Sequence, residues 1–224
     1  MDYRMKCEVD VHDVDYNGVA KTSSILRYMQ TAAQCQLTDS GMSYDNLRKR
    51  NRAFVISRLK LEVLRPLPTY TPLTAITYPC ESRGYSFLRC YALESDGQPV
   101  ARAISVWALI DTESRGLVRV NDFDLGLPLL PQNGLVLGAM KLPSNLTDIG
   151  GYGVHYGDVD QNMHMNNTNY PDMFFSFIPG VEKCCVKDMS FTYKAEAPLG
   201  AELTAALYSS SLIFSSSYIF ITAS

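Results

Sequence analysis

The amino-acid sequence predicts an α+β fold made of two copies of one unit, an antiparallel sheet wrapped around a long helix. Three observations lead to this fold class. A stretch with helical period precedes several stretches with strand period, the same order of patterns starts again after residue 151, and a short turn motif recurs 145 residues later. A chain of 224 residues is long enough for two such units, each with its own core.

The first unit is expected to open with a strand over residues 3–12 and a turn over residues 13–18. A helix should follow, because apolar residues recur there at a spacing of 3.6 residues. Its stripe consists of Ile25, Leu26, Met29, Ala32, Ala33 and Leu37. The hydroxyl side chains of Thr22, Ser23 and Ser24 are candidate N-caps, and Gly41 is placed to end the helix.

Beyond this helix the apolar period changes to two, which is typical of strands. Leu59, Leu61 and Val63 alternate with charged residues, and further strands are predicted over residues 73–80, 85–93 and 100–110. The tripeptide Ser95-Asp96-Gly97 predicts a hairpin turn between the last two of them. One long helix with four or five long antiparallel strands predicts a hotdog-like unit over residues 1–123.

Residues 124–151 are predicted to be a linker, because three prolines and five glycines interrupt any regular period. The second unit, over residues 152–224, should repeat the first: a short strand at 152–157, a turn at 158–162 and a helix. Asn169 is the expected N-cap of that helix, and Pro179-Gly180 should end it. Strands are predicted at 184–194, 202–208 and 212–222, one fewer than in the first unit.

The turn motif is the clearest part of the repeat. Residues 13–17 and 158–162 are identical at four of five positions, and Ser24 falls on Asn169 at the same offset. The copies differ at one important position, because His164 falls on Val19. The second copy alone keeps a side chain that titrates near neutral pH. The sequence therefore predicts one chemical site per chain, in the second unit.

The candidate site begins with Asp160-x-Asn162-x-His164, whose alternate side chains point the same way in an extended loop. His164 can accept a proton near pH 7, and Asp160 can orient the imidazole or an attacking water. Asn162 and the N–H groups of the following helix can donate to a carbonyl oxygen that gains charge, as in a thioester under attack. The competing interpretation is an Asx-rich turn that only caps a helix.

Metal sites are not favoured, and no cofactor is predicted. Residues 13–18 match the first half of an EF-hand loop, but the twelfth position is Ser24 rather than a glutamate. With three histidines in the chain, a zinc site would need ligands from distant segments. Cys184 or Cys185, predicted to be buried in a strand, stays open as a nucleophile paired with His164.

Charge and cysteine usage limit the class of protein. A net charge of -3 and a pI near 5.6 argue against nucleic-acid binding. The six cysteines form no CxxC pair, and the polar first ten residues do not resemble a signal peptide, so a cytoplasmic protein with reduced thiols is expected. No apolar run reaches the roughly 18 residues of a membrane span.

One window is strongly basic. Residues 48–65 carry a net charge of +6, against -9 for the rest of the chain. Such a patch can attract an acidic partner, although a solvated strand face is the plainer interpretation. The window is called the basic segment below, and its seven cations are Arg48, Lys49, Arg50, Arg52, Arg58, Lys60 and Arg65.

Residues 158–170 carry a pattern, Asp-x-Asn-x-His-x-Asn-Asn-x-x-Tyr, that resembles the signature of the acyl-acyl carrier protein thioesterases. The resemblance extends over nearly the whole chain and implies a double hotdog fold. It further implies hydrolysis of fatty acyl-acyl carrier protein thioesters to free fatty acid, which ends chain elongation. The run Tyr193-Lys194-Ala195-Glu196 matches the family's Tyr-x-x-Glu context, so the implied catalytic set is Asp160, Asn162, His164 and Glu196. The sequence leaves two roles open for Asp160, which either orients the other groups or attacks the thioester directly.

The sequence departs from this family at two places. Many plant members have a cysteine directly after the catalytic glutamate, whereas Ala197 stands here, which favours attack by water. The serine-rich tail at 209–224 suggests a missing last strand, and keeps a non-catalytic acyl-binding protein as an alternative beside a hotdog dehydratase or hydratase. The resemblance implies the acidic acyl carrier protein as partner of the basic segment, and a monomer or homodimer.

Overall fold

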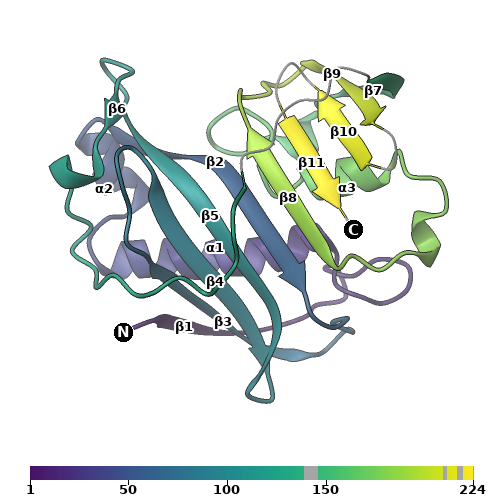
Figure 1. Cartoon of the computed structure of the whole chain (residues 1–224), viewed down its shortest axis with the longest axis horizontal. Coiled ribbons are helices and arrows are strands. Elements are labelled where there is room, and N and C mark those ends of the chain that lie inside the picture. Colours follow the sequence, from purple (N-terminus) through teal and green to yellow (C-terminus); the bar gives the residue numbers. More distant parts are fainter. Residues whose placement is uncertain (139–145, 209–210, 216–218, 224) are drawn as a thin grey trace.

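The computed structural model describes residues 1–138, 146–208, 211–215 and 219–223. Two hotdog units lie side by side, the first coloured purple to teal and the second, smaller one green to yellow (Figure 1). The predicted double hotdog is therefore confirmed. No helix among the described residues is long and apolar enough to cross a membrane.

The first unit is a sheet in the order β1-β3-β4-β5-β2, in which every neighbouring pair is antiparallel. Helix α1 lies against β1, β3 and β4, behind the sheet in Figure 1. The predicted hairpin between β4 and β5 forms, with Asp96 and Gly97 at positive φ. The elements are β1 (Tyr3–Glu8), α1 (Thr22–Asp39), α2 (Tyr44–Lys49), β2 (Arg52–Val63), β3 (Pro72–Pro79), β4 (Phe87–Ser95), β5 (Gln98–Asp111) and β6 (Leu117–Val118).

The second unit repeats this strand order. Strand β9 pairs with β7 and β10, β11 pairs with β8, and β10 lies beside β11, so the order β7-β9-β10-β11-β8 corresponds to β1-β3-β4-β5-β2. The predicted strand over 212–222 is in fact two strands, so the last strand is present and that expectation was wrong. The elements are β7 (Thr147–Gly153), α3 (Tyr170–Phe175), β8 (Asp188–Tyr193), β9 (Glu202–Tyr208), β10 (Ser211–Ser215) and β11 (Ile219–Ala223).

The two helices differ in length. Helix α1 has 18 residues and buries its predicted stripe except for the half-buried Leu37. Helix α3 has six residues, so the expectation of a long helix in both units was wrong for the second. After α3 the chain makes i→i−3 turns, such as Phe177 N to Phe174 O at 3.1 Å. Pro179 disfavours the helical conformation at the residue before it, and Gly180 has a left-handed φ of 75°.

The helix caps also differ from prediction. Helix α1 starts at Thr22 after Lys21, without a side-chain cap, and Ser23 and Ser24 are fully buried inside its first turn. Ser23 Oγ donates to Asp172 Oδ2 of α3 at 2.8 Å, whereas Ser24 Oγ accepts from Arg27 within α1 at 2.9 Å. Ser23 therefore contributes to the contact between the two units.

The units are joined along an edge strand of each, and these strands lie in the middle of the combined sheet. Strand β2 pairs with β8 in antiparallel register, from Arg58 opposite Thr192 to Glu62 opposite Asp188. Together with β11 and β6 this makes one eight-stranded sheet across the molecule. One hydrophobic core continues through both units, with Leu59 and Leu61 of β2 beside Met189 and Phe191 of β8.

The first part of the predicted linker packs on the outer face of the first sheet. Leu130 N donates to Pro79 O at 3.0 Å, and Asn133 Nδ2 donates to Ala103 O at 2.9 Å. Leu135 is buried against Cys80, in the small cluster on that face. Residues 139–145 of the linker lie outside the described residues, and β7 starts at residue 147, before the strand predicted from residue 152.

Candidate active site

The predicted turn of the second unit is a tight loop that precedes α3. Val159 bridges to Met165, Asp160 N donates to His164 O at 3.1 Å, and Met163 N donates to Asp160 O at 2.9 Å. The loop closes through Met163, which has a positive φ of 67°. This closed backbone holds Asp160, Asn162 and His164 on one short segment, but as a tight turn, so the expectation of an extended loop was wrong.

Glu196 reaches this loop because the segment after β8 runs beside it. Met165 N donates to Ala197 O at 2.8 Å, and His164 bridges to Pro198. As a result His164 Nε2 lies 3.4 Å from Glu196 Oε1. The two side chains are 27% and 65% exposed, so water reaches the pair. The structure thus brings together two of the four predicted catalytic residues directly.

Asp160 is engaged within the loop. Its Oδ1 accepts from Asn162 N at 2.8 Å, and its Oδ2 accepts from Asn166 Nδ2 at 3.3 Å. The first of these bonds is an Asx turn, in which a short carboxylate stabilises the backbone two residues ahead. Of the two roles that the sequence left open for Asp160, this geometry supports orientation of its neighbours over direct attack.

Asn162 is contacted from the other unit. Its Oδ1 accepts from the hydroxyl of Tyr44, the first residue of α2, at 2.8 Å. Gln30 of α1 reaches the same loop and donates to Asn167 Oδ1 at 2.6 Å. Sequence reasoning missed both residues, since Tyr44 and Asn162 are 118 positions apart and no motif marks either contact.

The rest of the Asn-rich run fastens the loop to the fold. Tyr193 donates its hydroxyl to Asn167 O at 3.1 Å, and burial raises the pKa of Tyr193 well above its usual value, which keeps the donor neutral. Asn169 precedes α3, but its Nδ2 donates to Asp158 O at 3.1 Å rather than capping the helix. With α3 only six residues long, the expected helix-start donors contribute little.

The first unit repeats this backbone at the predicted offset. Asp15 N donates to Val19 O at 2.9 Å, Ala20 N donates to Leu67 O at 2.8 Å, and Gly18 has a φ of 72°. Asp15 Oδ1 accepts from Asn17 N at 2.8 Å, as Asp160 does from Asn162. The internal repeat is therefore confirmed at the level of hydrogen bonds.

The first unit has no counterparts of the His164 and Glu196 side chains. Val19 stands where the second unit has His164. Pro66, directly before Leu67, stands where the second unit has Glu196. The first loop is thus a matched scaffold without the histidine–glutamate pair.

No hydrogen bond of the described residues supports the cysteine alternative. Cys184 and Cys185 are exposed and precede β8, so the prediction that both are buried in a strand was wrong. Neither thiol is hydrogen-bonded to His164 within the described part of the chain. Over the same residues, no group of three His, Cys, Asp or Glu side chains is arranged to hold a metal ion.

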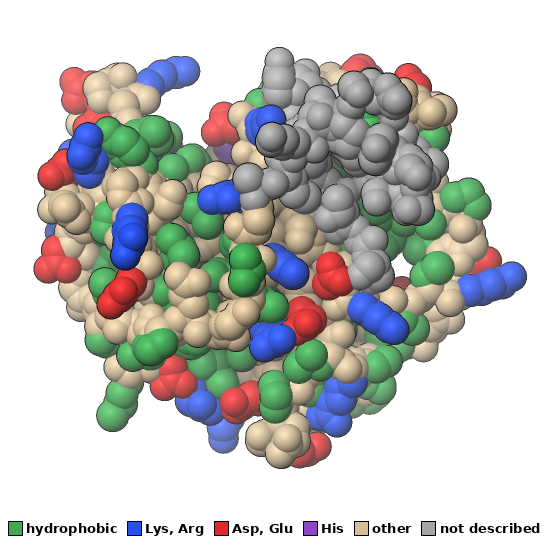
Figure 2. Space-filling view, viewed as in Figure 1, with side chains coloured by type: hydrophobic (Ala, Val, Ile, Leu, Met, Phe, Trp, Pro, Cys, Tyr) green, Lys and Arg blue, Asp and Glu red, His purple; other side chains and the backbone are tan. Residues whose placement is uncertain are grey.

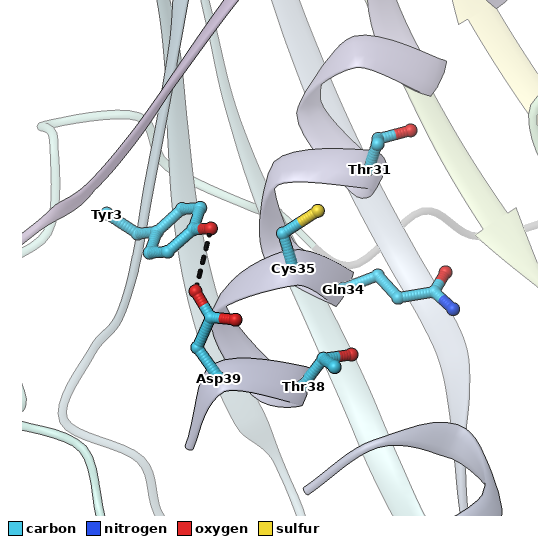
Figure 3. Close-up of a pocket in the computed structure, with 6 residues that line it drawn as sticks. All are labelled: Tyr3, Thr31, Gln34, Cys35, Thr38 and Asp39. Atoms are coloured by element: carbon cyan, nitrogen blue, oxygen red, sulfur yellow. Dashed lines mark hydrogen bonds between the residues drawn. The ribbon is translucent and has the colours of Figure 1, made fainter. Parts of the chain in front are cut away.

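Two surface grooves of the first unit lie away from the His164–Glu196 pair. The first has a volume of about 320 Å³ and lies beside the exposed face of α1, where Tyr3 donates to Asp39 Oδ2 at 3.0 Å (Figure 3). The second, about 470 Å³, lies beside β1 and β3 and includes Arg4 and Glu94. Both contain charged side chains, which are poor walls for an acyl chain. The lining of the first is Tyr3, Thr31, Gln34, Cys35, Thr38 and Asp39.

The basic segment divides into parts with different surroundings. Its cations at positions 48–50 are exposed at the end of α2, while Arg52 is paired with Asp111 and Arg58 lies half-buried along β2. Figure 2 shows Lys and Arg side chains interspersed with Asp and Glu over the visible face. The exposed cations at positions 48–50 adjoin the candidate site. Arg48 Nη1 lies 3.4 Å from the hydroxyl of Tyr44, which contacts Asn162.

Comparison with protein families agrees with this architecture. A model described as the acyl-ACP thioesterase N-terminal domain matches residues 1–124, and one described as the acyl-ACP thioesterase C-terminal domain matches residues 144–218. An oleoyl-acyl carrier protein thioesterase of Arabidopsis thaliana is 25% identical over 79% of this chain and 54% of its own length. One from Coriandrum sativum is 24% identical over 88% of this chain and 57% of its own. The chain spans about half the length of these relatives.

Solved structures show the same fold. An acyl-ACP thioesterase from Bacteroides thetaiotaomicron has a TM-score of 0.86 and 20% identity, with 99% of this chain and 96% of that one covered. A 12:0-ACP thioesterase from Umbellularia californica has a TM-score of 0.80 and 15% identity over 99% and 96% of the two chains. Likeness at this identity concerns the fold, whereas the chemistry depends on the residues described above.

Proposed function

Because the chain belongs to the acyl-ACP thioesterase family, we propose that it hydrolyses fatty acyl-acyl carrier protein thioesters to free fatty acid. The observation that carries this proposal is the approach of His164 Nε2 to Glu196 Oε1 at 3.4 Å, with His164 two residues after Asn162 in the same loop. A carboxylate next to an imidazole can act as a general base at neutral pH.

In the proposed reaction, Glu196 and His164 together remove a proton from water as its oxygen attacks the thioester carbon. Asn162 donates its amide N–H to the carbonyl oxygen, which becomes negative when the carbon turns tetrahedral. The carbon–sulfur bond then breaks, the carbonyl re-forms, and the leaving sulfur takes the proton as a thiol. Asp160 keeps the loop in shape through Asn162 N and Asn166.

We place the acyl chain along the first unit and assign the chemistry to the second. Support for this division is that Gln30 and Tyr44, both from the first unit, contact the loop that carries Asn162. The acidic acyl carrier protein would meet the exposed cations at positions 48–50, which adjoin Tyr44. Opposite charges there would mainly raise the rate of encounter.

The central experiment measures thiol release from a panel of acyl carrier protein and coenzyme A thioesters. His164→Ala and Glu196→Ala should each lower turnover by about 10²-fold or more if the pair is the base. A matched control is Val19→Ala, because Val19 is the counterpart of His164 in the unit without the pair. Unchanged turnover in both second-unit variants would reject the assignment.

The same assay separates the alternatives. A hotdog dehydratase or hydratase would change absorbance at a carbon–carbon double bond without releasing thiol. A non-catalytic acyl-binding protein would retain the acyl thioester intact. The presence of β10 and β11 removes the main reason for that second alternative, which was a missing last strand.

The carrier surface is tested by single charge reversal. Lys49→Glu should raise KM for carrier-linked substrate more than for a short soluble thioester, and added salt should reduce the difference. The control is Lys183→Glu, an exposed lysine in the segment that follows α3, as Lys49 lies in the segment that follows α1. Equal effects of Lys49→Glu on both substrates would remove the carrier surface from the proposal.

A further inference from the structure

The orientation of the Asn162 amide is fixed by a chain of two donors. Arg48 Nη1 lies 3.4 Å from the Tyr44 hydroxyl oxygen, and a guanidinium can only donate. The Tyr44 oxygen therefore accepts from Arg48, and its own proton is directed to Asn162 Oδ1, 2.8 Å away. The Arg48 Cζ also lies 5.7 Å from the centre of the Tyr44 ring, which holds the two side chains together.

This arrangement leaves the other end of the amide available. Asn162 is exposed, and within the described residues its Nδ2 has no hydrogen-bond partner. With Oδ1 occupied by Tyr44, the two N–H bonds of Nδ2 are directed away from α2. An amide held in this way can donate to a substrate oxygen without first rotating.

The counterpart in the first unit is turned the other way. Asn17 Nδ2 donates to the main-chain oxygen of Glu182 at 3.2 Å, and a carbonyl oxygen can only accept. One of the Asn17 N–H bonds is thus already used by the protein. In each unit the asparagine is contacted by the segment that follows the other unit's helix, but the contacts leave opposite ends of the amide free.

We propose that Tyr44 is a positioning residue, which holds Asn162 so that its N–H bonds face the thioester oxygen. This inference rests on the proposed function and assigns a part of the second-unit site to the first unit. Tyr44 touches no reacting atom and acts through Asn162. The active site is accordingly built from both units, and neither unit alone holds its oxygen-binding group in place.

The test is a double-mutant cycle between Tyr44→Phe and Asn162→Ala. Phenylalanine keeps the ring that packs under Arg48 and removes only the hydroxyl. We expect Tyr44→Phe to lower kcat by about tenfold with KM nearly unchanged, because the loss falls on the transition state. In the Asn162→Ala background the same substitution should have no further effect. The control is Tyr3→Phe, which removes a tyrosine hydroxyl that donates to the Asp39 carboxylate instead. This variant should leave kcat unchanged.

The outcomes separate this inference from the function itself. A tenfold loss that disappears in the Asn162→Ala background, with an unchanged Tm, supports positioning. An equal loss in both backgrounds, a change confined to KM, or no loss overturns it while thiol release by the wild-type protein still upholds the hydrolase. Absence of thiol release from every thioester tested with the wild-type protein would overturn both.

Discussion

The two turn loops have the same backbone and different chemistry. Residues 13–20 and 158–165 share the Asx turn and the backbone hydrogen bond that closes the loop. Each loop also bridges to the segment that follows β2 in the first unit and β8 in the second. They differ in the residues that this scaffold presents, which are Val19 and Pro66 in one unit and His164 and Glu196 in the other. The comparison separates what the fold needs from what the reaction needs.

What recurs in both loops belongs to the scaffold. Asp15 accepts from the backbone N of Asn17 in a loop that has no histidine, so this aspartate is kept for the turn itself. The same bond from Asn162 to Asp160 then needs no catalytic explanation. The residues that set the second unit apart are the pair His164–Glu196 and the amide orientation of Asn162.

The sharpest test of this comparison exchanges the residues that differ. His164→Val places the first-unit residue in the second loop, where the shared backbone should accept it, and turnover should fall by about 10²-fold or more. Circular dichroism and Tm should stay close to wild type. The reciprocal Val19→His, made in the His164→Val protein, should restore no turnover, because Pro66 cannot replace Glu196.

Two results would break the comparison. If His164→Val unfolded the protein, the histidine would be part of the scaffold rather than a group presented by it. If Val19→His in the His164→Val background restored thiol release, the first loop would be competent without a carboxylate partner. Either result is read from the same thiol assay together with a thermal melt.

Much of the fold follows from local sequence patterns. The stripe from Ile25 to Ala33 predicted α1, and alternation around Leu59 predicted β2, because a half-buried helix or strand must place apolar residues on one side. The boundaries of the second unit were less readable. Two short apolar runs separated only by Ser215, Ser216 and Ser217 were predicted as one strand over 212–222, and Pro179 limited α3 more than the stripe to Ile178 indicated.

The site could be predicted in part for a similar reason. Asp160, Asn162 and His164 lie within one loop, as their spacing indicated, but this loop is a tight turn and the period of an extended segment does not set the directions of their side chains. Glu196 was found only by resemblance to a family, since its approach to His164 depends on the bond from Met165 N to Ala197 O. Tyr44 could not be found, because its contact with Asn162 depends on how the two units pack.

The role of Asp160 gives a smaller expected effect on turnover. Asp160→Asn keeps an oxygen that can accept from Asn162 N, but an amide cannot attack a thioester. If the aspartate serves the loop, as in the first unit, turnover should stay within about tenfold of wild type. The matched Asp15→Asn should change Tm by about as much as Asp160→Asn does, and it should leave turnover unchanged. A loss of turnover as large as that of His164→Val would assign Asp160 to the chemistry.

The two helices differ in length, and the contact of the short helix α3 with α1 through Asp172 can be tested. Burial raises the pKa of Asp172 in α3 above its usual value, against the opposing influence of Ser23, Lys21 and Arg27. A raised pKa in the folded state means that protonation favours folding. This contribution is present in full below the unfolded pKa of about 3.8 and is lost as the pH rises through the folded value.

Asp172→Asn removes this titration and keeps an oxygen for Ser23 Oγ. The variant should therefore have a higher free energy of unfolding than wild type at pH 7, and the difference should shrink as the pH falls toward 4. Urea unfolding at several pH values measures it. Asp96→Asn, at the exposed tip of the β4–β5 hairpin, is the control. A destabilised variant at pH 7 would show that the carboxylate itself holds α3 to α1.

The smallest expected effect concerns the residue at the tip of each loop. Met163 has a φ of 67° where its counterpart Gly18 has 72°, so the second unit holds a side chain in a left-handed conformation that glycine adopts freely. The Met163 side chain is 66% exposed and gives little packing in return. Met163→Gly should raise the free energy of unfolding by up to about 1 kcal/mol, the usual cost of such a conformation less the entropy of a more flexible unfolded chain. The reverse change, Gly18→Met, should lower the free energy of unfolding by a similar amount.

If Met163→Gly instead lowers turnover without lowering stability, the methionine contacts the substrate. The second loop then differs from the first at its tip as well as at His164.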